Sequence, residues 1–243
     1  MCGRFNVTSD PLTEIFMEWA NEPYPGDDNF NTSPTAQAWI IRPDSDGKYE
    51  AANARWWLVP HWSSGPSNRY AMFNAKSETL KSSNAFKGPF ERRRCVLPVS
   101  GFYEWTMRND RKLPHYIQPR DSSAMLLASL WDRWHSKTSD EIIESFTIAT
   151  TAASPQLEFV HRRQPVMLSK PGAVEWMAKD QDATVLADLM SPRLALDLSV
   201  IPVSTFVSNS RNNGPRCIEP VGDPIELGAM GAHVTVTEGE EHE

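Results

Sequence analysis

Residues 93–105 read RRCVLPVSGFYEW: an apolar run, a Ser-Gly break, and a second short run rich in aromatic residues. We predict two strands here, 94–97 and 101–105, because both runs are short and are separated by turn-forming residues. Further strands are predicted over 36–42, 49–57, 115–118, 124–131, 143–150 and 199–207. Helices are predicted over 11–21, where Leu12, Ile15, Phe16 and Trp19 recur at helical spacing, and over 171–178 and 183–190, with short helical pieces around 78–87. This order predicts a single α+β domain with a curved, mainly antiparallel, barrel-like sheet as its core and flanking helices.

Composition excludes several classes of protein. The 243 residues contain no apolar run of eighteen and no basic segment followed by an apolar stretch at the start, so neither a membrane span nor a secretory signal is predicted. The three cysteines lie far apart and lack CxxC spacing, which favours a reducing compartment and argues against a structural zinc site. We expect a cytoplasmic protein, which in a bacterium would lie in the cytoplasm or the nucleoid. We expect it to use no metal and no cofactor.

The charge is unevenly distributed along the chain. The formal net charge is −7, which argues mildly against non-specific binding to nucleic acid. However, the last ten residues carry four acids and no Lys or Arg, so we assign 223–243 to a C-terminal segment ending in an acidic, disordered tail. Elsewhere, basic residues gather at Lys87 and 92–94 and again within 108–112. Such clusters are either solvated faces or a track for phosphates.

Cys2 is the first residue with distinctive chemistry. Small residues at position two commonly allow removal of the initiator methionine, and the chain would then begin with a free α-amine and a thiol on adjacent carbons. Such a 1,2-aminothiol condenses with an aldehyde through an imine, which the thiol closes into a five-membered thiazolidine. An amino-terminal cysteine can also act as a nucleophile with its own amine as the base. The alternative is that Cys2 has no chemical role.

Glu104 is the second candidate. Along a strand, Phe102 and Glu104 face one way while Tyr103 and Trp105 face the other. A carboxylate among apolar neighbours is costly without a partner, and partial burial would suit it to acid–base catalysis. A structural glutamate paired with an arginine is the alternative.

Three further stretches carry candidate residues. His161 is followed by two arginines, which would hold an anion nearby and favour the neutral ring. Asn74 could hold the terminal amine or simply form a turn. The tryptophans near residue 60, including Trp57 and Trp62, offer surfaces on which bases could stack, although tryptophans more often lie in the core.

Four segments occur together in a distinctive order: Met-Cys-Gly-Arg-Phe at 1–5, Phe-Asn-Ala-Lys-Ser-Glu-Thr at 73–79, the run at 93–105, and His-Arg-Arg-Gln-Pro-Val at 161–166. Together they resemble the SOS-response-associated peptidase (SRAP) family, whose members sense abasic sites in DNA. The resemblance covers residues 2 to about 222, which we therefore take as one SRAP-like catalytic domain.

The resemblance implies a covalent DNA–protein crosslink, a thiazolidine, that shields the abasic site from strand cleavage. Carried onto matching positions, it makes Cys2 the crosslinking residue, Asn74 an anchor of the active site, Glu104 the acid–base residue and His161 the residue that handles the sugar. It implies phosphate contacts near Arg4, Lys76, Lys87 and Arg163, to which we add stacking by Trp57 or Trp62 on the last base pair.

The resemblance also implies a partner. We expect single-stranded DNA with abasic sites, or a junction with duplex, in a groove of a monomeric protein. The chain departs from the family pattern at Lys76 and Lys87, where arginine is usual, and at Gln164, where methionine is usual. Lysine keeps the charge but lacks the two-pronged geometry of arginine, so these departures bear on DNA binding more than on the chemistry.

Other functions stay open from the sequence. Class II glutamine amidotransferases also begin Met-Cys-Gly, so an amino-terminal-nucleophile hydrolase is one alternative, although their Arg-Gly-Pro-Asp segment is absent. A peptidase acting on a substrate other than DNA is a second, and the removal of Met1 could be the only proteolysis that it performs. A DNA-binding module without catalysis is the third.

Overall fold

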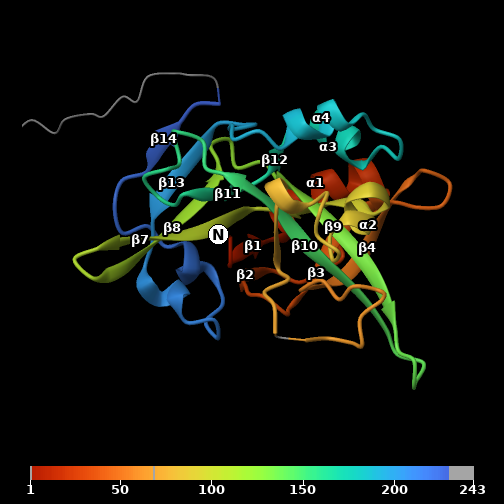
Figure 1. Ribbon diagram of the computed structural model, residues 1–243. Helices are drawn as coiled ribbons and strands as arrows, with labels where there is room; N and C mark the ends of the chain where they lie inside the picture. The colour runs from red at the N-terminus through yellow and green to blue at the C-terminus, as the bar shows by residue number, and fades with distance from the viewer. Residues whose placement is uncertain (1, 68, 230–243) are drawn as a thin grey trace, which may run out of the picture.

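A computed structural model describes residues 2–67 and 69–229 (Figure 1). Five strands form a closed barrel because β9 pairs with both β6 and β10. In order around the barrel they are β10 (Ile142–Ala152), β4 (Tyr49–Trp56), β3 (Gln37–Pro43), β6 (Arg94–Val99) and β9 (Met125–His135). Three short strands, β5 (Asn74–Lys76), β11 (Arg163–Pro165) and β12 (Met167–Leu168), pair with β10 or β9. The α+β architecture with a barrel-like, mainly antiparallel core is thus confirmed.

A second sheet lies beside the barrel. Its order is β14 (Ile225–Leu227), β13 (Leu198–Pro202), β8 (Arg111–Pro119), β7 (Gly101–Arg108), β1 (Phe5–Val7) and β2 (Asn29–Thr32). All of its pairings are antiparallel. The first described residues, which lead into β1, lie between the two sheets (Figure 1).

The run 93–105 joins the two sheets. Its first half is β6 of the barrel and its second half begins β7, so the chain passes from one sheet to the other at Ser100. Gly101 follows at a point of close approach, where an added Cβ would lie 2.6 Å from the carbonyl oxygen of Ile117 and 2.6 Å from the ring of Tyr116. Any larger residue would push β7 away from β8.

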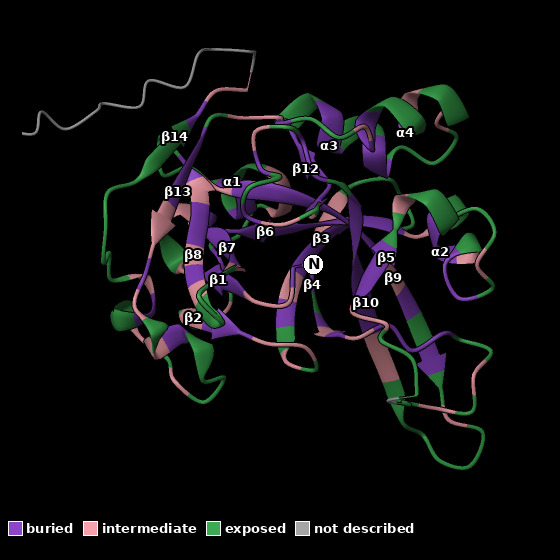
Figure 2. Ribbon diagram, turned by 60° about the vertical axis from the view of Figure 1, so that its left-hand side comes forward, coloured by how far each residue is buried: buried purple, intermediate pink, exposed green. Residues whose placement is uncertain are grey.

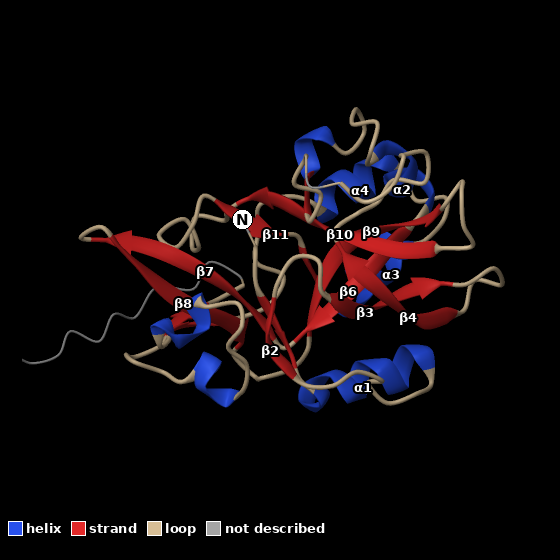
Figure 3. Ribbon diagram, turned by 90° about the horizontal axis from the view of Figure 1, so that it is seen from below, coloured by secondary structure: helices blue, strands red, loops and turns tan. Residues whose placement is uncertain are grey.

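Four α-helices occur among the described residues: α1 (Ser9–Ala20), α2 (Lys87–Arg92), α3 (Lys170–Met177) and α4 (Ala183–Leu189). Helix α1 lies on one side of the barrel, with α2 and α4 on the opposite side (Figure 3). Apolar spacing correctly predicts the buried face of α1, Leu12, Ile15 and Phe16. Its regular part begins at Pro11, as predicted, because Asp10 has an extended backbone (φ −102°, ψ 118°). None of these helices is long and apolar enough to cross a membrane.

The core consists of two clusters of buried side chains. The larger fills the barrel and the space beneath the helices, and it includes Phe5, Trp56 and Trp176. The smaller lies on the other face of the second sheet around Tyr103 and Tyr116. Strands of the barrel are buried over most of their length, whereas the helices expose their outer faces (Figure 2).

Several local predictions were wrong or incomplete. The segment 199–207 is a strand only to Pro202 and then a 3₁₀ turn, η2 (Thr205–Ser208). Short helical pieces around 78–87 are present as the turn η1 (Ser77–Thr79) and the start of α2 at Lys87, although the segment between them is not helical. A further turn, η3 (Pro215–Ile218), and strands β1, β2, β5, β11, β12 and β14 were not predicted. Strand β14 lies beyond residue 222, while the acidic end of the chain, from residue 230, is outside the described residues.

Candidate active site

Strand β1 determines where Cys2 lies. Phe5 anchors this strand in the core, with its ring centroid 4.6 Å from that of Trp56. The segment before Phe5 continues alongside β7, since the amide of Tyr103 donates a 2.9 Å hydrogen bond to the carbonyl oxygen of Arg4. This antiparallel run brings Cys2 next to Glu104, and the Glu104 charge acts on the Cys2 thiol.

Asn74 holds the backbone of Cys2. Its Nδ2 donates a 2.7 Å hydrogen bond to the Cys2 carbonyl oxygen, and both residues are buried. Asn74 begins β5, which is aligned with β10 through the pair Asn74–Ile148. The preceding residue, Phe73, accepts a 2.8 Å hydrogen bond from the indole of Trp56. The same Trp56 ring contacts Phe5. Trp56 therefore links the segment that carries Cys2 to the segment that carries Asn74.

The Cys2 thiol is a neutral group in this setting. Its side chain is completely buried in the chain that still carries Met1. Burial, reinforced by the negative charge of Glu104, raises the pKa of the Cys2 thiol to about 12. The sulfur lies 3.8 Å from the carbonyl oxygen of Arg4, the acceptor of a weak S–H hydrogen bond. At neutral pH the thiol is therefore protonated, unlike the low-pKa cysteines of thiol-activated enzymes.

Glu104, His161 and Arg163 line one small pocket. Glu104 and Phe102 project from the same face of β7, and both line this pocket. Tyr103, between them, points to the other face and lies in the smaller core cluster. The predicted alternation along this strand is thus confirmed. Glu104 is 5% exposed, so its carboxylate lies in a largely dry environment. The remaining lining residues are Ile117, Leu157, Val160 and Gln164.

The hydrogen bonds of His161 bear on its tautomer. The backbone N–H of Arg163 donates to His161 Nδ1 over 3.0 Å, which requires a lone pair on Nδ1. A neutral ring then carries its proton on Nε2. A ring that carries a proton on Nδ1, whether neutral or charged, instead donates to the carbonyl oxygen of Arg163, 3.1 Å away. Either way, the backbone of Arg163 holds His161 Nδ1 and leaves Nε2 for other contacts.

Gln164 stabilises the loop that carries His161. Its Oε1 accepts a 2.7 Å hydrogen bond from the Ser154 amide, and its Nε2 donates a 2.9 Å bond to the carbonyl oxygen of Arg193. Gln164 is 2% exposed, so these bonds satisfy a buried amide. The glutamine at this position closes the turn from residue 154 to β11 by polar contacts.

Two of the predicted phosphate-contact residues flank the site. Lys76 ends β5, two residues after Asn74, and is exposed. It is aligned with Thr150 of β10, whose carbonyl oxygen accepts a 2.6 Å hydrogen bond from Arg163. Arg163 also forms an ion pair with Glu78. Lys76 and Arg163 thus lie on either side of one β10 residue.

The other predicted DNA-contact residues are more dispersed. Arg4 is half-buried and engaged, because its Nη1 donates to Asn31 Oδ1 over 2.6 Å and to the carbonyl oxygen of Val207 over 3.2 Å. Burial lowers the pKa of its guanidinium. Trp62 is 55% exposed, whereas Trp57 is half-buried against Phe73. Lys87 is exposed at the start of α2. Trp57, Trp62 and Lys87 are not among the described residues that line the pocket.

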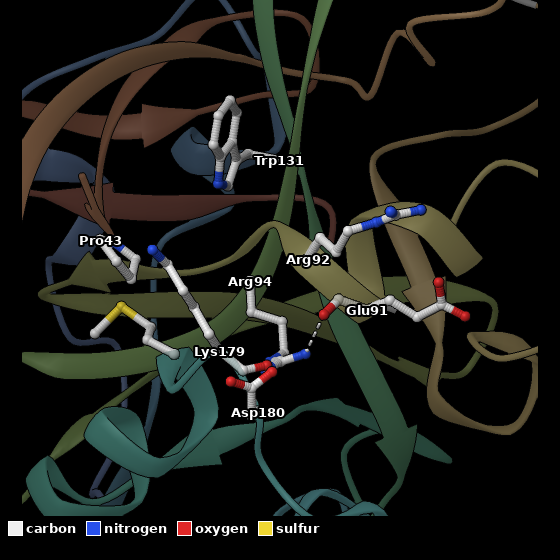
Figure 4. A pocket seen from close by; sticks show the side chains of 8 residues that line it. Pro43, Glu91, Arg92, Arg94, Trp131, Lys179 and Asp180 are labelled. Carbon is white, nitrogen blue, oxygen red and sulfur yellow. Dashed lines mark hydrogen bonds between the residues drawn. The ribbon is translucent and has the colours of Figure 1, made fainter. Parts of the chain in front are cut away.

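The basic run 92–94 is not a continuous surface track. Arg94 is buried, and its guanidinium donates to backbone carbonyls at the ends of α2 and α3, among them Phe90, Trp176 and Ala178. Arg94 lines a larger pocket together with Arg92, Trp131 and Lys179, and the guanidinium of Arg92 points away from that of Arg94 (Figure 4). Arg93 forms an ion pair with the buried Asp132. Arg93 and Arg94 therefore serve the fold.

Some residues of the site were missed by sequence reasoning. Glu78 and Thr150 hold Arg163, and Asn31 holds Arg4. Glu78 follows Lys76 closely in the sequence and could have been noticed, but nothing marks Thr150 or Asn31. Within 2–67 and 69–229, no group of three or more His, Cys, Asp or Glu is arranged to hold a metal ion.

Comparisons with known proteins agree on one family. The family model described as "SOS response associated peptidase (SRAP)" matches residues 1–210. Abasic site processing protein YoqW of Bacillus subtilis is 31% identical over 227 residues, which cover 90% of this chain and 99% of YoqW. Abasic site processing protein HMCES of Gallus gallus is 30% identical over 217 residues, covering 79% of this chain and 65% of HMCES. A crystal structure of a protein from Bacteroides thetaiotaomicron has the same fold, with a TM-score of 0.78, 21% identity, and coverage of 90% of this chain and 100% of that one.

Proposed function

The chain belongs to the SOS response associated peptidase (SRAP) family, and on this premise we propose that it processes abasic sites in DNA by forming a covalent crosslink through Cys2. The observation that carries the proposal is the hydrogen bond from Asn74 to the Cys2 carbonyl oxygen, which holds Cys2 beside Glu104. A pocket lined by Glu104 and His161 supports it, because the acid–base groups that the reaction needs face one space.

The crosslink requires removal of Met1, by a cellular aminopeptidase or by the protein itself. The Cys2 nitrogen is then a primary amine. Asn74 Oδ1 is buried and has no hydrogen-bond partner within the part of the chain that the structure describes. Because Asn74 Nδ2 already binds the Cys2 carbonyl oxygen, its Oδ1 is the natural acceptor for the freed amine. Asn74 would thus hold Cys2 by both ends of its backbone.

The first steps form an imine. An abasic deoxyribose equilibrates between a closed ring and an open C1′ aldehyde. His161 in its protonated form donates a proton to the ring oxygen as the ring opens, while the C1′ hydroxyl loses its proton to water and becomes the aldehyde oxygen. An α-amine has an ordinary pKa of about 8, so Glu104 accepts a proton from the ammonium and frees the amine to attack C1′. The resulting carbinolamine loses water, with Glu104 returning the proton.

The last step closes the ring. The Cys2 sulfur adds to the imine carbon, and its proton passes to the imine nitrogen or to Glu104. One water is lost overall, from the aldehyde oxygen. Even a thiol with an ordinary pKa is largely protonated at neutral pH, which favours attack by the freed amine before the sulfur. Closure within one residue has a very high effective concentration, so the thiazolidine traps the sugar before strand cleavage by β-elimination.

The proposed partner is single-stranded DNA that contains an abasic site, or its junction with duplex. Lys76 and Arg163 beside the pocket are the proposed phosphate contacts, with Arg4, Lys87, Trp57 and Trp62 as more distant ones. No base need be read, so binding should be independent of sequence and sensitive to salt. We propose that the protein acts as a monomer in the cytoplasm.

A denaturing gel tests the proposal. Purified, trimmed protein is mixed with a single-stranded oligonucleotide bearing one abasic site, and mass spectrometry identifies the linked residue. We expect a shifted band that survives heat and denaturant and carries the DNA on Cys2. Intact oligonucleotide, a Cys2→Ala variant and protein with a blocked amino terminus are the controls, and none should give the band. Absence of a band with the trimmed wild-type protein would overturn the proposal, and reversible binding alone would favour a non-catalytic DNA-binding module.

A further inference from the structure

Arg163 and Glu78 form a two-pronged ion pair at the mouth of the site. Arg163 Nη1 donates to Glu78 Oε1 over 2.7 Å, and Nη2 donates to Glu78 Oε2 over 3.0 Å. Nη2 also donates to the carbonyl oxygen of Thr150 over 2.6 Å, which ties the guanidinium to strand β10. The two partners differ in exposure, because the Arg163 side chain is 13% exposed and that of Glu78 is 54% exposed. The cation is fixed and the anion is accessible.

This geometry describes an oxyanion site whose occupant can be exchanged. The flat guanidinium presents two parallel N–H groups that fit a phosphate as well as a carboxylate. Glu78 shows that an oxyanion fits this position beside the pocket. An ion pair with a half-exposed carboxylate contributes little net free energy, so replacing Glu78 by another anion carries a small cost.

We infer that Glu78 is a specificity-determining residue, whose carboxylate occupies the Arg163 fork in the free protein and is replaced by a DNA backbone phosphate. The inference rests on the proposed function. Arg163 lines the same pocket as Glu104 and His161, so the phosphate that reaches it belongs to the strand next to the sugar in the pocket. An intact nucleotide carries a base on C1′, which holds its sugar farther from the small pocket, so on this inference its phosphate does not displace Glu78. Glu78 therefore discriminates against undamaged DNA.

The binding and chemical roles of this segment are separable. His161 contacts the backbone N–H of Arg163, while Glu78 contacts the guanidinium. The backbone of Arg163 is held by pairing with Ala152 in β10. A change at Glu78 therefore frees the side chain of Arg163 without moving the contacts between its backbone and His161 Nδ1.

The test measures equilibrium binding of a Glu78→Gln variant to two single-stranded oligonucleotides. One is intact, and the other carries a tetrahydrofuran abasic analogue that has no aldehyde and cannot crosslink. We expect Glu78→Gln to bind the intact strand about fivefold more tightly, since a competing carboxylate worth about one ion pair is lost. The analogue should gain less, so selectivity for it falls. For the intact strand, the slope of log K against log salt should steepen by about 0.7, the contribution of one additional phosphate.

Two matched variants separate this inference from a general charge effect. Glu18→Gln, on α1, removes the same charge from an ion pair with Lys170 of α3, and should leave both affinities unchanged. In an Arg163→Ala background, Glu78→Gln should have no effect on the salt slope. If Glu78→Gln tightens binding equally with and without Arg163, or leaves selectivity unchanged, the inference is overturned. Crosslinking of the same wild-type preparation to a third strand, which carries a natural abasic site with its aldehyde, reports on the proposed function separately. If the wild-type protein crosslinks to that strand and Glu78→Gln leaves binding of the other two strands unchanged, the inference alone is overturned.

Discussion

The side-chain amide of Asn74 and the backbone carbonyl of Cys2, 72 residues apart in the chain, are joined by a 2.7 Å hydrogen bond. Both groups are buried, so the bond is protected from water and holds the amino-terminal segment in one position. The site thus depends on a contact between the start of the chain and the first residue of β5.

Replacement of Asn74 should reduce both stability and crosslinking. Asn74→Ala leaves the buried Cys2 carbonyl oxygen without this donor, which costs about 1–3 kcal/mol of the free energy of unfolding. Urea denaturation measures this loss, and the denaturing gel measures the rate of crosslinking. Asn53→Ala, a change at an exposed asparagine of β4, is the control and should alter neither. Unchanged stability of Asn74→Ala would contradict the importance of this bond.

The charge of Glu104 should control the titration of Cys2. Glu104→Gln removes a negative charge that raises the pKa of the thiol, so the alkylation rate of Cys2 should reach its midpoint at lower pH. Mass spectrometry of the Cys2 peptide after iodoacetamide treatment at a series of pH values measures the shift. The Cys95 peptide is an internal control, because burial raises the pKa of that thiol without a contribution from Glu104. A midpoint that stays fixed or rises would show that Glu104 does not act on Cys2.

Stability should fall in alkaline solution partly because of Cys2. The pKa of this thiol is about 12 in the folded protein against an ordinary 9.0, so below pH 9 it is protonated in both states and contributes no pH dependence. Between pH 9 and 12 only the unfolded chain loses the proton, and the free energy of unfolding decreases by up to about 1.4 kcal/mol per pH unit. Cys2→Ala should show a shallower decline in urea denaturation between pH 8 and 10.5 under reducing conditions. Parallel declines for the two proteins would contradict the buried, neutral thiol.

His161 should contribute to the reaction more than to folding. His161→Gln keeps a hydrogen-bonding side chain but removes the proton donor, so single-turnover crosslinking should slow by about 100-fold or more. Because His161 is only half-buried, the melting temperature should change little. Quenched time points on a denaturing gel give the rate. A reduction of less than twofold would exclude His161 as the proton donor for ring opening.

Arg94 should matter for folding. Its guanidinium binds the carbonyl oxygens of Phe90 and Trp176 at 2.5 Å each, so Arg94→Met leaves the ends of two helices without their donor. We expect a loss of about 3 kcal/mol or more in the free energy of unfolding. Arg92→Met, at the exposed neighbour, should cost less than about 0.5 kcal/mol. If Arg94→Met and Arg92→Met lower the free energy of unfolding equally in urea denaturation, Arg94 has no greater structural role than its exposed neighbour.

The sequence predicted features that depend on neighbouring residues better than features that depend on distant ones. Alternation along β7 was sufficient to separate Glu104 from Tyr103, because neighbouring side chains of a strand point to opposite faces whatever else surrounds it. Apolar spacing likewise identified the buried face of α1. The short strands β1 and β2 were missed, because their stability comes from pairing with distant partners such as β7 and not from local composition.

The basic residues within 87–94 show what the sequence could not predict. Lys87 and 92–94 are alike in charge and close in the sequence, yet Arg94 lies inside the protein and Arg93 pairs with Asp132. Which arginine is accessible depends on the ends of α2 and α3 and on a carboxylate in β9, and these come from distant parts of the chain. Charge alone predicts the presence of cations but not which of them meets a partner.

The sequence by itself determined the chemistry available to this protein: an aminothiol at position two once Met1 is removed, a carboxylate on a defined face of β7, and a histidine beside arginines. These are properties of single residues and their immediate neighbours. Only the tertiary structure decided that Cys2 is buried with a raised pKa, that Asn74 holds it, and that Glu78 occupies Arg163. Each of these depends on desolvation or on a contact between distant segments, and neither exists until the barrel closes and brings β1, β5 and β11 together.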